Sequence, residues 1–142
     1  MGELLVKRLI AFRDLVGPGA LPAVKRVAME IEHEFAERHS FASRPINLDP
    51  GYLTEAKVVL ASTKDRGHRV YLAGGIFAEA TLEYREGRFH PFPWTYADFR
   101  SEPVLAFFAL LRESFREERP ERGETTPRRR AARSRKRSPR RS

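Results

Sequence analysis

HRVYLAGGIFAEATLEYREGRFHPF, residues 68–92, contains three runs of β-branched and aromatic residues separated by two glycine-containing turns. Gly74-Gly75 suits a two-residue hairpin turn, and Glu86-Gly87 suits a second one. The proline near the end cannot donate a hydrogen bond to a neighbouring strand, so the third strand should be short and lie at an edge. The stretch therefore predicts an antiparallel β-meander.

The turn at residues 74–75 also predicts how the first two strands pair. The expected pairs are Leu72 with Phe77, Val70 with Glu79, and His68 with Thr81. The opposite, core-facing side would carry Tyr71, Ile76, Ala78, Ala80, Leu82 and Tyr84. Glu79 would then lie on a half-apolar surface, where its carboxylate needs a partner.

Two histidines fall near a carboxylate in this register. Continued through the second turn, it sets His90 opposite Glu83, with His68 diagonally across from Glu83. Two imidazoles and a carboxylate can hold a metal ion or transfer a proton. The alternative, which we favour, is a solvated sheet face with two incidental histidines, and we assign no metal ligand.

Helical periodicity flanks the meander. Apolar side chains recur at helical spacing in residues 3–16, and a Gly-Pro-Gly sequence ends this pattern. The same spacing occurs in residues 21–38 and 104–118, so each of the three stretches predicts a helix. In the second of these helices we expect a buried stripe of Val24, Val27, Ala28, Ile31 and Phe35. The opposite, outer face would carry Lys25, Glu32 and Glu37. These elements predict an α+β domain in which the meander packs against three to four helices.

Residues 55–62, EAKVVLAS, fit either a helix or a strand. They follow a turn at Asp49-Pro50-Gly51, and Thr54 could cap a helix. Short apolar runs of this kind do not discriminate between the two structures. We expect a short third helix.

Composition confines the domain to residues 1–118. This part holds 16 Lys+Arg and 17 Asp+Glu, whereas residues 119–142 hold 11 Lys+Arg and two Glu, so the net charge of +8 comes from the tail. The tail has almost no apolar residues, and we expect it to be disordered. The chain has no cysteine and no apolar run long enough to span a bilayer. We expect a cytoplasmic protein without a membrane partner.

The tail offers one functional interpretation. Its arginine clusters could neutralise nucleic-acid phosphates without sequence preference. The candidate contacts are Arg128, Arg129, Arg130, Arg135, Lys136 and Arg137. The tail has no aromatic residue to stack on bases, and an extension without a selected role is the equal alternative.

Several motifs together resemble a bacterial family catalogued as domain of unknown function 4416. They are INLDPGYLT at residues 46–54, LASTKDR at 60–66, HRVYL at 68–72, GIFAE at 75–79 and PWTY at 93–96. The resemblance covers roughly residues 2–118. It implies a further N-terminal segment with an apolar strand, which this chain would lack. An exposed sheet edge would then favour self-association.

The same region supplies the candidate ligand contacts. Loops hold binding residues disproportionately, and residues 62–66 place hydroxyls and charges of both signs in a loop. The candidates are Asp49, Tyr52, Lys57, Lys64, Asp65, Arg66, His68, Glu79, Trp94 and Tyr96. One interpretation is a pocket for a small anionic ligand. The other is an ion-pair network that ties the loop to the sheet.

The aromatic segment PWTYADF, residues 93–99, has two interpretations as well. Trp94 and Tyr96 could line a ligand site, or the segment could fasten the last helix to the sheet, which we favour. No GxxxxGK[ST] phosphate loop occurs in the chain. Neither a nucleophile with its base nor a cofactor motif stands out, so cofactor and reaction stay unassigned. A small ligand-binding protein is the leading hypothesis, followed by a nucleic-acid-associated module and a structural or partner-binding protein.

Overall fold

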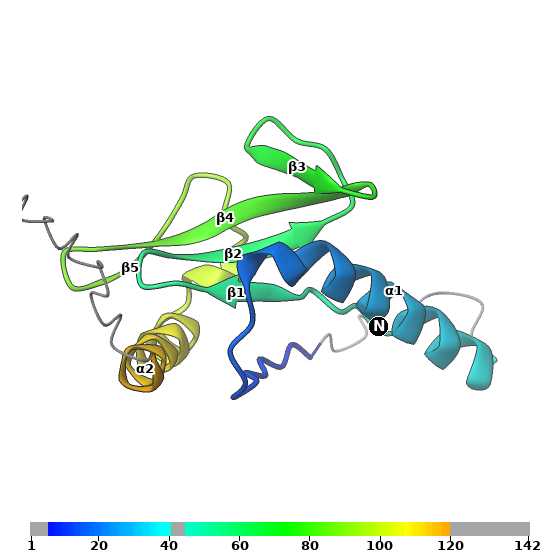
Figure 1. The fold of residues 1–142 in the computed structure, drawn as a ribbon, viewed down its shortest axis with the longest axis horizontal. Helices are drawn as coiled ribbons and strands as arrows, with labels where there is room; N and C mark the ends of the chain where they lie inside the picture. Colours follow the sequence, from blue (N-terminus) through cyan, green and yellow to red (C-terminus); the bar gives the residue numbers. More distant parts are fainter. Residues whose placement is uncertain (1–5, 41–44, 120–142) are drawn as a thin grey trace, which may run out of the picture.

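The structure is a computed structural model that describes residues 6–40 and 45–119. Its elements are η1 (Pro18–Ala20), α1 (Leu21–Arg38), β1 (Gly51–Leu53), β2 (Lys57–Ser62), β3 (Arg69–Ala73), β4 (Ile76–Arg85), β5 (Arg88–Pro91), η2 (Ala97–Arg100) and α2 (Glu102–Glu118). The five strands form one antiparallel sheet in the order β1-β2-β4-β3, with β5 also paired to β4 (Figure 1). The fold is α+β.

The predicted meander is confirmed as β3, β4 and β5. Gly74 and Gly75 adopt positive φ angles of 57° and 78° at the first turn, and Glu86 and Gly87 adopt 51° and 80° at the second. β2 pairs along one side of β4. The other side of β4 pairs with β3 near its start and with β5 near its end. The third strand is therefore short and lies at an edge, as expected.

Two of the predicted helices are absent from the described residues. Residues 6–16 form no helix, and residues 1–5 lie outside the described part of the chain. The helix expected over 55–62 is wrong, because Lys57–Ser62 forms β2. This strand pairs on both sides, with β1 and β4, and a tight turn in which Thr54 N–H donates to the Lys57 carbonyl joins it to β1. The described residues thus contain two α-helices, not three to four.

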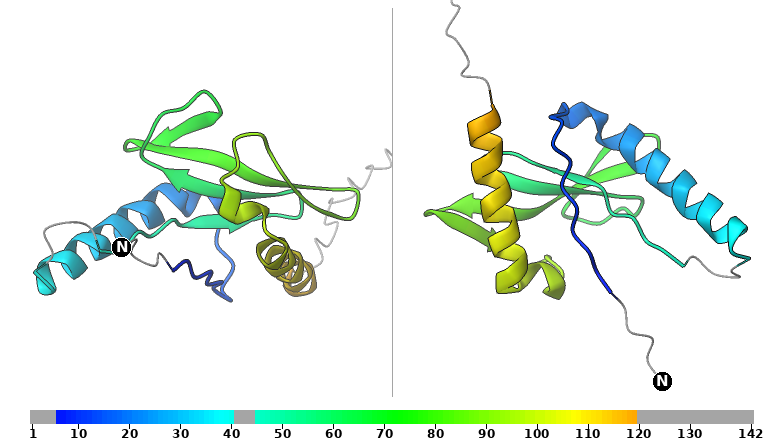
Figure 2. Two further views of the ribbon diagram at one scale, coloured as in Figure 1. Left: turned by 180° about the vertical axis from the view of Figure 1, so that it is seen from behind. Right: turned by 90° about the horizontal axis from the view of Figure 1, so that it is seen from below.

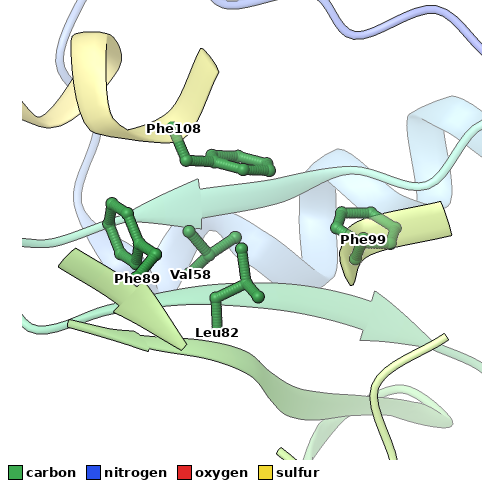
Figure 3. Packing of buried hydrophobic residues seen from close by; sticks show 5 residues of the cluster. All are labelled: Val58, Leu82, Phe89, Phe99 and Phe108. Carbon is green, nitrogen blue, oxygen red and sulfur yellow. The ribbon is translucent and has the colours of Figure 1, made fainter. Parts of the chain in front are cut away.

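Alternate side chains of β2 point to opposite faces of the sheet and belong to two apolar clusters, one on each face. On the α2 face, the buried residues are Val58, Leu82, Phe89, Phe99 and Phe108 (Figure 3). On the α1 face, they are Leu21, Val59, Ala61 and Ile76. Leu82 and Tyr84 were expected on the face of Ile76 and Ala78. They join the other cluster because the β2–β4 register shifts between Val58 and Val59.

Helix α1 has the predicted bounds but not the predicted orientation. Its buried residues are Leu21, Lys25, Ala28 and Glu32. Of the expected stripe only Ala28 is buried, whereas Val24, Val27, Ile31 and Phe35 are exposed. The polar pair Lys25 and Glu32, expected on the outside, lies inside because both side chains bind the backbone of Leu48. Hydrogen bonding to this segment, together with the Leu21 and Ala28 contacts, sets the face that the helix buries.

The segment before α1 crosses the α2 side of the sheet. Figure 2 (right) shows it passing between α2 and α1. Leu9 packs against the cluster that α2 covers, and Lys7 pairs with Asp98 at η2. Neither described helix has the length and apolar character required to cross a membrane. Residues 120–142, which include every nucleic-acid candidate, lie outside the described residues.

Candidate functional site

The site is built around the buried carboxylate of Glu79, in the middle of β4. Arg69 Nε donates to its Oε2 at 2.8 Å, and His68 Nε2 lies 2.9 Å from the same oxygen. The hydroxyl of Thr81 donates to Oε1 at 3.4 Å. Glu79 thus has the partners that a carboxylate on a half-apolar surface requires.

The partner across the strand pair is Arg69, not the expected Val70. The strands pair Ala73 with Ile76 next to the turn, but the register shifts between Tyr71 and Ala73. One residue of β3 is therefore extra, and Arg69 moves opposite Glu79. The predicted pairs of Leu72 with Phe77 and His68 with Thr81 are wrong for the same reason.

Arg69 also connects the carboxylate to the loop after β2. Its Nη1 donates to the Lys64 carbonyl at 3.0 Å, while Nε binds Glu79. The Lys64 N–H donates in turn to the hydroxyl of Ser62 at 3.2 Å. These bonds hold the backbone of Lys64 from two directions. Among the described residues, no buried side-chain nitrogen or oxygen lacks a hydrogen-bond partner.

An open pocket of about 620 Å³ lies beside this network. It is lined by the loop before β1, the end of β2 and the loop that follows it, the start of β3, the middle of β4, and η2 with its preceding residue. Lys7 from the segment before α1 and Lys25 from α1 complete the lining. Its charged lining residues are Lys7, Lys25, Asp49, Lys64, Arg69, Glu79 and Asp98. Hydroxyls of Ser62, Thr63 and Tyr96 and the amide of Asn47 add neutral polar groups.

Three of the four cations in this pocket are matched by the three carboxylates. Lys7 pairs with Asp98, Lys25 lies 3.7 Å from Asp49, and Arg69 binds Glu79. Lys64 is the remaining cation, and its ammonium group makes no ion pair within residues 6–40 and 45–119. The pocket lining therefore carries one uncompensated positive charge.

The wall formed by residues 47–49 is held by α1. Lys25 Nζ donates to the Leu48 carbonyl at 2.9 Å, and the Leu48 N–H donates to Glu32 Oε1 at 2.6 Å. Asn47 donates to Asp49 Oδ2 at 2.8 Å, which orients that carboxylate. The buried polar side chains of α1 thus hold the backbone of Leu48 in place.

The Trp94 segment fastens the chain to the sheet. Its indole N–H donates to the Ala80 carbonyl at 2.8 Å, and its ring stacks with those of Phe92 and His68 at centroid distances of 4.8 and 5.0 Å. The Thr95 hydroxyl donates to the Thr81 carbonyl at 2.6 Å. These contacts hold the indole against β4, and the side chain remains 37% exposed.

The predicted ligand contacts divide into three groups. Asp49, Lys64, Glu79 and Tyr96 line the pocket. His68 and Trp94 are not among the lining residues, but His68 binds the Glu79 carboxylate and Trp94 stacks on His68. The remaining candidates, which are not among the lining residues, are Tyr52, Lys57, Asp65 and Arg66.

Two of those outlying residues have other surroundings. Tyr52 packs against the cluster on the α1 face. Lys57 begins β2 at its far end from the pocket and pairs in register with Glu83.

The histidine arrangement is only partly as expected. His90 does lie opposite Glu83 in the β4–β5 pair. However, the Nε2 of His90 lies 3.2 Å from the Arg85 carbonyl, and His68 is bound to Glu79. The two imidazoles and Glu83 do not converge. The part of the chain that the structure describes contains no cluster of three or more potential metal ligands.

Sequence reasoning missed four charged pocket residues, namely Lys7, Lys25, Arg69 and Asp98. Lys25 carried a signal, because it lies seven residues before Glu32 on the same face of α1 as Leu21 and Ala28. Arg69 would have been predicted opposite Glu79 if the β3–β4 register had been shifted by one residue. Nothing in the local sequence connects Lys7 with Asp98, which are 91 positions apart.

Comparison with known proteins agrees with the motifs that suggested a family. The sequence model described as Domain of unknown function (DUF4416) matches residues 1–115. Because this match starts at residue 1, it does not show the missing N-terminal segment that the resemblance suggested. No curated protein and no solved structure matches the chain. With a match over more than half of its residues, the chain belongs to the DUF4416 family.

Proposed function

We propose that this protein binds a small anionic ligand in the pocket beside Glu79, with Lys64 as the principal contact. The observation that carries the proposal is the charge balance of the lining. Every carboxylate there has a cationic partner, and Lys64 alone among the lining cations makes no ion pair within the described residues. A free ammonium group on the wall of a concave site favours an anion.

The backbone around Lys64 supports the same conclusion. Its carbonyl accepts from Arg69 and its N–H donates to Ser62, so the loop is ordered before any ligand arrives. Binding then costs less conformational entropy than it would at a mobile loop. The Ser62 and Thr63 side chains line the same pocket and add hydroxyl donors for phosphate or carboxylate oxygens.

The pocket also favours a ligand with neutral polar groups. Asp49 and Asp98 are partly exposed at its edge and accept hydrogen bonds. A hydroxylated anion, such as a sugar phosphate or hydroxy acid, would satisfy both Lys64 and these carboxylates. We therefore propose a ligand with a single anionic group and several hydroxyl groups.

The test uses inorganic phosphate as the probe and two matched lysine substitutions. Phosphate is titrated into isotopically labelled full-length protein and followed by the amide resonances of residues 62–64. Lys64→Gln should weaken binding about tenfold, because a charge-assisted hydrogen bond contributes about 1.5–3 kcal/mol. Lys57→Gln, at the far end of β2, should change the affinity less than about twofold, since about 0.4 kcal/mol corresponds to that factor.

Two outcomes would overturn the proposal. In one, millimolar phosphate leaves residues 62–64 unperturbed and native mass spectrometry of the freshly purified chain shows no co-purifying anion. In the other, both lysine variants weaken binding equally. Either result would favour the structural interpretation, in which the Glu79 network is scaffolding. Phosphate perturbing only the arginine-rich tail would instead favour the nucleic-acid-associated module.

A further inference from the structure

We infer that Glu79 selects hydroxylated ligands by accepting a hydrogen bond from a ligand hydroxyl at its Oε1 atom. The inference rests on the proposed anion site at Lys64 and adds a role in ligand binding for Glu79. This residue lines the pocket, yet its side chain is only 5% exposed. Asp49 and Asp98, the other two carboxylates of the lining, are 46 and 43% exposed. Glu79 is therefore the buried carboxylate of the lining.

The two oxygens of this carboxylate are bound unequally. Oε2 accepts from Arg69 Nε at 2.8 Å and lies 2.9 Å from His68 Nε2. Within residues 6–40 and 45–119, Oε1 accepts only from the Thr81 hydroxyl, at 3.4 Å, and that hydroxyl also lies 3.3 Å from the Glu79 carbonyl oxygen. A hydroxyl has one proton to donate, whereas a carboxylate oxygen can accept two hydrogen bonds. Oε1 thus retains the capacity to accept from a ligand.

One guanidinium group connects Glu79 to the loop that carries Lys64. Arg69 binds the carboxylate through Nε and the Lys64 carbonyl through Nη1, at 2.8 and 3.0 Å. A small ligand in the pocket of about 620 Å³ can therefore contact both residues. Their opposite charges fix its orientation, because Lys64 attracts the anionic group and Glu79 repels it. The hydroxyl end of the ligand then lies at Glu79.

Burial makes this contact selective. A ligand with a methylene group at this position fills the space without donating, and it leaves Oε1 shielded from water with one long hydrogen bond. Sites that bind a hydroxyl through buried polar groups reject analogues that lack it for this reason. At the half-exposed Asp49 and Asp98, water can replace the missing hydroxyl, so these carboxylates discriminate less. The geometry favours a phosphorylated or carboxylated polyol over an alkyl phosphate or carboxylate of the same size.

Two ligands with the same carbon skeleton and the same charge test the inference. Glycerol 3-phosphate carries two hydroxyls, and propyl phosphate carries none. Each is titrated into isotopically labelled full-length protein and followed by the amide resonances of residues 62–64. The unmodified protein should bind glycerol 3-phosphate about tenfold more tightly, as expected for one hydrogen bond to a charged acceptor.

Two matched substitutions in β4 assign this preference to a residue. Glu79→Gln should reduce it to about twofold, because a neutral amide oxygen is a weaker acceptor than a carboxylate. Glu83→Gln should preserve it, since Glu83 pairs in register with Lys57 and is not among the lining residues. Because Glu79→Gln also removes a buried charge, a second readout uses unmodified protein. The carboxylate carbon resonance of Glu79 should move several times further with glycerol 3-phosphate than with propyl phosphate.

The outcomes separate this inference from the proposed function. Equal affinities for the two ligands would overturn the inference and leave the anion site intact. So would a preference that survives Glu79→Gln but disappears in Asp98→Asn, or a Glu79 carboxylate resonance that responds equally to both ligands. If neither ligand perturbs residues 62–64, the proposed anion site itself fails, and the inference fails with it.

Discussion

Arg69 and Glu79 face each other across the β3–β4 pair, with the guanidinium Nε 2.8 Å from the carboxylate Oε2 and both side chains more than nine-tenths buried. Charges removed from water in this way are stabilising only as a pair, because each one compensates the desolvation of the other. The pair therefore links the stability of the sheet to the geometry of the pocket.

Glu79→Gln should lower the free energy of unfolding by about 3 kcal/mol, because a neutral amide leaves the buried guanidinium uncompensated. Urea denaturation measures this change. Glu83→Gln, four residues further along β4 and half exposed, should cost less than about 1 kcal/mol. Equal costs for the two variants would show that the Arg69 pair is not a buried element of the sheet.

Glu32→Ala should release the loop before β1. The carboxylate accepts the Leu48 N–H, and loss of this buried acceptor should cost about 2 kcal/mol. Hydrogen exchange at the Leu48 amide should accelerate more than exchange in β4. Glu34→Ala, on the exposed side of the same helix, should leave that amide unchanged.

The orientation of α1 can be tested with two neighbouring residues. Val27→Lys should change stability by no more than about 0.5 kcal/mol, because the side chain is already exposed. Ala28→Lys should destabilise by more than about 2 kcal/mol, because it places an ammonium group in a buried position. Thermal or urea unfolding of the two variants compares these effects. The opposite order would mean that the apolar stripe is the packed face.

Gly51→Ala should be more damaging than its small size suggests. A Cβ at this position would meet the Val59 carbonyl and the Leu60 side chain across the β1–β2 pair. We expect a loss of about 1–3 kcal/mol, as for other overpacked sites. At Gly67, a Cβ would meet nothing within 4 Å, so Gly67→Ala should be neutral or slightly stabilising. Denaturation midpoints for the two alanine variants provide the measurement.

Local patterns predicted the elements of the fold better than their packing. The bounds of α1 and the two turns of the meander follow from proline, glycine and periodicity, and the structure confirms them. The face of α1 could not be predicted in this way. Its apolar stripe, which includes Val24 and Ile31, has the usual helical spacing, but Lys25 and Glu32 bind Leu48 and turn the stripe outward.

The errors in the sheet have a different cause. Val58 and Val59 suit a helix locally, and only the strands on both sides of β2 make them part of a sheet. The one-residue shift before Ala73 has no sequence signal of its own, yet it exchanges Val70 for Arg69 opposite Glu79. Contacts between distant segments, such as Lys7 with Asp98, could not be predicted without the fold.

The stack of His68 on Trp94 provides a built-in optical probe. The chain has one tryptophan, so all of its indole fluorescence arises from a ring that touches the imidazole bound to Glu79. A change at the carboxylate reaches that ring through a single intervening side chain. The emission spectrum therefore reports on the pocket without a label, and a ligand screen can begin with unmodified protein in a cuvette.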